Sequence, residues 1–253
     1  MPLSQAVAVG IDSTSGHKAF TVAAIDKELG IVQLAEAEFD EVIAYLQTQP
    51  QVIVALSTPS HVSTGVVRKR LERGRDGARD VRGADLRQAE YDLHSMGIAV
   101  IGTPRHEAEC PAWMQLGFAL LRRLTQLGYK ANPSAEAECQ WLETHPHAAF
   151  CVLLGRSPLP KPTLEGRLQR ALVLFERGLG IRDPMSFLEE ITRHRVLNGL
   201  LPTDLVPLPA ELDALVAAYT AWMAISKPDE LTRLGNKQEG FIVLPARELL
   251  ANY

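Results

Sequence analysis

The stretch AVAVGIDSTSG, residues 6–16, predicts how the fold begins. Apolar and small side chains alternate in it up to Asp12. This period of two predicts a β-strand, because successive side chains of a strand point to opposite faces. Two further strand-like stretches, at residues 18–25 and 31–37, follow with turn residues between them. The first part of the chain therefore predicts three antiparallel strands, with a carboxylate at the end of the first.

The pattern changes after these strands. Apolar residues at helical spacing precede the continuous apolar run VIVAL at residues 52–56, which predicts a helix followed by a buried strand. By the same criteria we expect strands at 98–101 and 139–143 and helices at 39–46, 84–94, 111–127, 164–176, 185–196 and 210–223. The sequence predicts an α/β fold with a mixed sheet, three antiparallel strands followed by parallel strands, and flanking helices.

Length and composition restrict the class of protein. The 253 residues are 46% hydrophobic and 22% charged, which excludes a disordered or fibrous chain. No linker-like stretch divides the sequence, so we expect one domain over residues 1–253. The three cysteines have neither disulfide-framework nor zinc spacing. Because signal-peptide and membrane-span patterns are both missing, we expect a soluble cytoplasmic protein with no membrane partner.

Charge is distributed unevenly along the chain. The net charge is −4, yet residues 68–87 carry eight basic side chains against four acidic ones. Seven of the eight are arginines, which can bind phosphates bidentately. This Arg/Gly-rich insertion around residues 66–87 is therefore a candidate nucleic-acid contact, through Arg75, Arg79 and Arg82. The alternative is a solvated helix and loop held by ion pairs within the segment.

Three carboxylates at the ends of predicted elements are candidate catalytic and metal-binding residues. Asp12 ends the first strand, Glu143 lies in a late strand, and Asp213 lies near the start of the last helix. Oxygen ligands of this kind suit Mg²⁺ or Mn²⁺ beside a phosphate. The structural alternatives are an Asx turn, a solvated glutamate and a helix N-terminal acid, respectively. His17 and His145 are candidate proton carriers, or else loop and packing residues.

The last predicted helix carries Asp213 on a face of small residues. Ala217, Thr220 and Ala224 share this face with the carboxylate. Because small side chains let a helix approach its neighbour closely, we expect this helix to lie close against the sheet.

Short motifs along the chain resemble one family. They are GIDSTSG at 10–16, ETHPHAAF at 143–150, LLGRSPL at 153–159, KPTLEGR at 161–167, DALVAAYTA at 213–221 and EGFIVLP at 239–245. Their order resembles that of the predicted RNase H-like nucleases of domain-of-unknown-function family 429. Parts of residues 82–117 are similar to the middle section of the same family.

The resemblance implies an RNase H-like fold and a metal site. It assigns Asp12, Glu143 and Asp213 as the presumed metal-site carboxylates. The chain departs from the family at Ser57, where the family usually has Asp in an Ile-Asp-x-Pro motif and this chain has LSTP. Serine is a neutral and weaker ligand, so we expect a second cation to be held less firmly.

Three functions stay open at this point. The first is a metal-dependent nuclease, in which Mg²⁺ or Mn²⁺ on the three carboxylates assists phosphodiester hydrolysis in nucleic acid. The second is an actin-like or sugar-kinase-like phosphotransferase, because GIDSTSG also resembles the first phosphate loop of that superfamily, although a second Gly-rich loop is missing. The third is a non-catalytic RNase H-like binding module, which the serine at position 57 favours.

Overall fold

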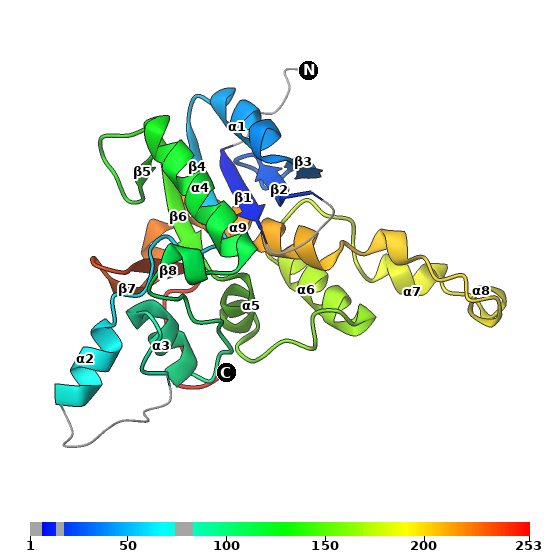
Figure 1. Ribbon diagram of the computed structural model, residues 1–253. Helices are drawn as coiled ribbons and strands as arrows, with labels where there is room; N and C mark the ends of the chain where they lie inside the picture. Colours follow the sequence, from blue (N-terminus) through cyan, green and yellow to red (C-terminus); the bar gives the residue numbers. More distant parts are fainter. Residues whose placement is uncertain (1–6, 14–17, 74–82) are drawn as a thin grey trace.

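The computed structural model of this chain describes residues 7–13, 18–73 and 83–253. Within them the strands form one mixed sheet in the order β3-β2-β1-β4-β6-β8-β7, and β5 pairs with β6 beside this path (Figure 1). The strands are Ala8–Asp12 (β1), Phe20–Ile25 (β2), Ile31–Ala37 (β3), Val52–Leu56 (β4), Lys130–Ala131 (β5), Cys139–Thr144 (β6), Thr232–Asn236 (β7) and Gly240–Leu244 (β8). The first three strands are antiparallel, whereas β4, β6 and β8 run parallel to β1. The predicted mixed α/β sheet is therefore confirmed.

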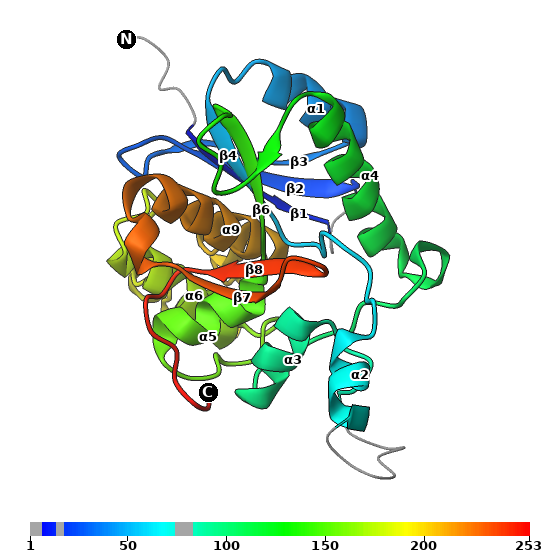
Figure 2. The same cartoon turned by 90° about the vertical axis from the view of Figure 1, so that its left-hand side faces the viewer.

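Helices cover both faces of the sheet. They are Phe39–Gln47 (α1), Val66–Arg73 (α2), Gln88–Ser95 (α3), Ala112–Gln126 (α4), Pro146–Leu154 (α5), Leu164–Glu176 (α6), Ser186–Glu190 (α7), Arg193–Leu197 (α8) and Pro209–Ser226 (α9). Helices α5, α6 and α9 pack on one face, and α1 and α4 pack on the other (Figure 2). Among the residues described, no helix combines the length and apolar character that crossing a membrane requires.

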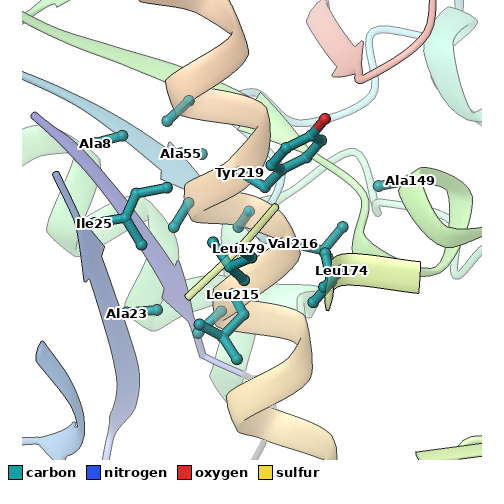
Figure 3. Packing of buried hydrophobic residues seen from close by; sticks show 14 of the residues in the cluster. Ala8, Ala23, Ile25, Ala55, Ala149, Leu174, Leu179, Leu215, Val216 and Tyr219 are labelled. Carbon is teal, nitrogen blue, oxygen red and sulfur yellow. The ribbon is translucent and has the colours of Figure 1, made fainter. Parts of the chain in front are cut away.

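Helix α9 lies very close to β1. A Cβ atom added to Gly10 would stand 2.0 Å from the carbonyl oxygen of Ala214 and 2.3 Å from the backbone nitrogen of Ala218. Only glycine allows this crossing. Figure 3 shows Leu215 and Val216 of α9 within the packed hydrophobic cluster on this face. The close approach predicted from the small residues of this helix is confirmed, and it brings the end of β1 next to the first turns of α9.

Two predicted elements are wrong. Residues 98–101 form no strand, because β8, from the far end of the chain, takes the place beside β6 that a parallel strand would occupy. Ile98 is instead buried against Leu93 of α3. The helix predicted at 185–196 is divided into α7 and α8, because Thr192 adopts an extended backbone and its side chain accepts a hydrogen bond at the start of α8. Apolar spacing alone could not indicate either outcome.

Candidate functional site

A cleft of about 370 Å³ lies at the carboxyl ends of the parallel strands. Asp12 ends β1, Ser57 directly follows β4, Glu143 lies near the end of β6, and Asp213 comes from α9; all four line the cleft. Sheets that alternate with helices usually bind ligands at this edge, outside the carboxyl ends of their strands. The fold thus brings the three predicted carboxylates to one cleft.

On one side of the cleft, Glu143 is held by Arg87. The guanidinium donates through Nη2 to Oε1 at 2.5 Å and through Nη1 to Oε2 at 3.1 Å. The backbone nitrogen and the hydroxyl of Ser60 donate to the same Oε2 at 2.7 and 2.6 Å. Arg87 is 1% exposed and Glu143 is 3% exposed. Both oxygens of Glu143 are therefore occupied by donors in the protein interior.

Arg87 also binds two other parts of the chain. Its Nε donates to Oε1 of Glu90 at 2.8 Å, and its Nη1 donates to the carbonyl oxygen of Glu239 at 3.0 Å. Burial alone would lower the pKa of Arg87, but the charges of Glu143 and Glu90 outweigh it and raise the pKa above its usual value. We call Arg87, Glu90, Glu143 and the Glu239 carbonyl the Arg87 network. It joins α3, β6 and the start of β8.

On the other side of the cleft lie the carboxylates of Asp12 and Asp213. Asp12 accepts a hydrogen bond from the hydroxyl of Ser57 at Oδ1, at 2.6 Å. Asp213 is ion-paired through Oδ2 with the ammonium of Lys161. Burial raises the pKa of Asp213 to about 6 against the opposing effect of Lys161, and the negative charge of Asp12 adds to the rise. We call Asp12 and Asp213 the carboxylate pair.

The alternation of strand residues separates these two sides. Glu143 is in register with Leu56, whose side chain packs under α1 and α4. Gly10, in phase with Asp12, faces α9 instead. Glu143 and Asp12 therefore leave the sheet on opposite faces. In the part of the chain that the structure describes, no group of three or more His, Cys, Asp or Glu is placed to hold a metal ion. The metal and catalytic roles of the three carboxylates stay predictions.

His145, one of the two candidate proton carriers, lies between a strand and a helix and lines the cleft. Strand β6 ends at Thr144, because Pro146 begins α5. His145 is the N-cap of that helix, and its Nδ1 accepts the backbone N–H of Ala148 at 3.1 Å. Burial, with a smaller effect of the neighbouring histidine ring, lowers the pKa of His145 to about 4. His17, the other predicted proton carrier, lies outside the described residues.

The predicted nucleic-acid contacts Arg75, Arg79 and Arg82 also lie outside the described residues and stay predictions. In the described flank, Arg68 donates to the carboxylate of Asp85 at 3.0 and 2.6 Å. This pair agrees with the alternative of ion pairs within the segment. Arg87 is one of the eight basic residues of this segment. It is buried in the Arg87 network, so its guanidinium is not available to a phosphate at the surface.

Sequence reasoning missed two residues of the cleft, Arg87 and Lys161. A local signal existed for Arg87, because Glu90 follows three residues later at the start of a helix and could form an i, i+3 pair. Lys161 is the first residue of the motif KPTLEGR, but its partner Asp213 lies 52 residues further along the chain. The pair of Arg87 with Glu143 and the pair of Lys161 with Asp213 have no sequence signal of their own.

Comparisons with known proteins identify the family of this chain but indicate no activity. The family model described as a protein of unknown function, DUF429, matches residues 10–239. No curated protein and no solved structure matches the chain.

Proposed function

We propose that this chain, which belongs to the DUF429 family of unknown function over residues 10–239, is a metal-dependent nuclease with an RNase H-like fold. One observation carries the proposal. Asp12 and Asp213, 1% and 6% exposed, line one cleft from β1 and α9, and the charge of one raises the pKa of the other. Two buried carboxylates that repel each other favour a cation beside them.

The residues of the cleft fit one divalent cation. Mg²⁺ is commonly held in enzymes by one or two carboxylates, with water and substrate phosphate completing its ligands. The carboxylate pair meets this need, and Mn²⁺ suits the same oxygen ligands. Glu143 does not fit as a ligand, because Arg87 and Ser60 occupy both of its oxygens. The proposed site is therefore a single-cation site with Asp12 and Asp213 as its protein ligands.

The chain's own residues supply the positioning. When bound, a cation of this kind stabilises charge on phosphate and lowers the pKa of a bound water. Ser57 holds the Asp12 carboxylate through Oδ1. His145, with a pKa of about 4, is neutral at pH 7. Its Nδ1 accepts the Ala148 N–H, so the neutral ring carries its proton on Nε2 and serves as a hydrogen-bond donor in the cleft rather than as a charged acid.

Two features support the fold and substrate parts of the proposal. The strand order β3-β2-β1-β4, with an antiparallel meander leading into parallel strands, agrees with the arrangement that the family resemblance implies. The excess of basic residues in the insertion around residues 66–87 supports nucleic acid as the substrate, because a polyanion is bound through positive charge.

Mn²⁺ titration calorimetry and cleavage assays on single- and double-stranded DNA and RNA test the proposal together. Asp12→Asn and Asp213→Asn should each abolish cation-dependent cleavage and weaken Mn²⁺ binding at least tenfold, a loss of about 1.4 kcal/mol or more. Asp229→Asn, at an exposed position, is the matched control and should change neither quantity. Wild-type protein that binds no Mn²⁺, or cleavage that survives Asp12→Asn, would overturn the proposal.

A non-catalytic nucleic-acid-binding module is the second candidate. One observation favours it: each predicted carboxylate already has a partner, namely Ser57 for Asp12, Lys161 for Asp213 and Arg87 for Glu143. Carboxylates that are already hydrogen-bonded or ion-paired within the protein do not require a cation. If this function is correct, the chain should bind nucleic acid in a salt-dependent manner in EDTA, and Asp12→Asn should leave that binding unchanged.

A further inference from the structure

The backbone around Lys161 is firmly held. The carbonyl oxygen of Leu159 accepts a hydrogen bond from Nη1 of the buried Arg170 at 2.8 Å. The carbonyl oxygen of Pro160 accepts one from the Thr163 hydroxyl at 2.9 Å. Gly166 of α6 packs against the same carbonyl, since a Cβ there would stand 2.0 Å from it. The loop between α5 and α6 therefore presents Lys161 from a fixed point.

The side chain of Lys161 is held less firmly than its backbone. It is 37% exposed, whereas the side chain of its partner Asp213 is only 8% exposed. A lysine side chain has four rotatable bonds and a strongly hydrated ammonium, so it can leave one partner and swing to another at little cost. The ion pair thus joins a fixed, buried carboxylate to a cation that can move.

Lys161 and a divalent cation compete for the same carboxylate. The ammonium pairs with Oδ2 of Asp213, and the proposed cation site uses the carboxylates of Asp213 and Asp12. Both cations neutralise the same buried charge, and placing both on Asp213 would bring like charges together. A divalent cation on Asp213 would therefore have to displace Lys161 from it.

We propose that Lys161 is an exchangeable counter-ion of the metal site: its ammonium holds Asp213 while no cation is bound, and it moves to the substrate phosphate when a divalent cation takes its place. The proposal rests on the proposed nuclease function and extends it. It gives Lys161 two roles, since it lowers the affinity for the cation in the absence of substrate and adds a phosphate contact in its presence. Substrate and cation would therefore bind cooperatively.

Mn²⁺ affinity, measured by calorimetry without substrate, tests the first role. Lys161→Met should bind Mn²⁺ more tightly than wild type, on the order of fivefold, the size expected when a partly exposed ion pair no longer competes. Lys161→Arg keeps the charge and should remain near the wild-type affinity. Lys227→Met is the matched control, because Lys227 is an exposed lysine paired with Glu230 outside the cleft, and it should leave the affinity unchanged.

Steady-state cleavage at saturating Mn²⁺ tests the second role. Lys161→Met should raise KM for the nucleic acid several-fold, whereas Lys161→Arg should largely retain the wild-type KM. A thermal melt of each variant with and without Mn²⁺ shows that it is folded, and Lys161→Met should gain more from Mn²⁺ than wild type does.

The outcomes separate this proposal from the function on which it rests. If wild type binds Mn²⁺ and Lys161→Met binds it no more tightly, the exchange is overturned while the metal site stands. If tighter binding comes with an unchanged KM, the phosphate contact is overturned. If neither protein binds Mn²⁺ by calorimetry or gains thermal stability from it, the nuclease proposal itself fails, and the exchange fails with it.

Discussion

On one side of the cleft, Arg87 is buried with Glu143 and Glu90, and on the other the carboxylate pair Asp12 and Asp213 has a serine hydroxyl and one partly exposed lysine. The carboxylates on the two sides are buried alike, so burial does not tell them apart. Their partners do. A guanidinium with several bonds in the protein interior cannot be exchanged without opening the fold, whereas the lysine reaches Asp213 from the surface. The comparison indicates a structural role for the first side, and the second side is the one on which we propose that a cation binds.

Removal of the buried guanidinium of Arg87 should have the largest effect on the free energy of unfolding. Arg87→Met leaves Glu143 and Glu90 buried without a counter-charge, so the free energy of unfolding should fall by about 3–5 kcal/mol. Chemical denaturation at pH 7 measures this loss. Arg68→Met is the matched control, because Arg68 forms its pair with Asp85 at the surface, and it should cost about 1 kcal/mol or less. Equal losses in the two variants would contradict a structural role for the Arg87 network.

The pH dependence of stability should report the titration of His145, which is half-buried. Its pKa in the folded chain is about 4, below the ordinary value of 6.5, so the unfolded chain binds its proton first as the pH falls. The stability due to the neutral ring is complete above pH 6.5 and is lost as the pH falls from 6.5 towards 4. Between pH 7 and pH 4.5 this loss should reach roughly 2 kcal/mol.

Replacing His145 isolates that contribution. His145→Asn keeps a good N-cap for α5 and removes the titration, so the variant should lose less stability than wild type over the same pH range. Denaturation curves at pH 7, 6, 5 and 4.5 compare the two proteins. Parallel stability profiles would mean that the His145 ring is solvated enough to titrate normally.

The smallest of these effects on stability should come from adding a carboxylate next to Asp12, on the side of the cleft that holds the carboxylate pair. Ser57→Asp places a third negative charge beside Asp12, which should destabilise the cation-free protein by about 1 kcal/mol and strengthen Mn²⁺ binding. Ser57→Asn is the control, because asparagine has the same size as aspartate but carries no charge. Calorimetry and thermal melts in EDTA and in Mn²⁺ measure both effects. Unchanged Mn²⁺ affinity in Ser57→Asp would favour the non-catalytic module.

Local patterns were enough to predict the framework of the cleft. Alternation in residues 6–12 and the apolar run at 52–56 predicted the strands that lie side by side at its centre, because side-chain period and strand burial are properties of a few consecutive residues. The small face of the last helix predicted its close approach to the sheet. These patterns also indicated where Asp12 and Asp213 would lie, at the end of a strand and near the start of a helix.

The pairing of charges around the cleft depends on long-range contacts. Arg87 lies 56 residues from Glu143 and 152 residues from the Glu239 carbonyl that it also binds, and Lys161 lies 52 residues from Asp213. No local preference encodes such pairs, since they depend on which strand ends and loops the sheet order brings together. The same reason explains the missing strand at 98–101, whose place is taken by a strand from the end of the chain. Local patterns predicted most of the elements and the positions of their carboxylates, and long-range packing determined which partner each carboxylate has.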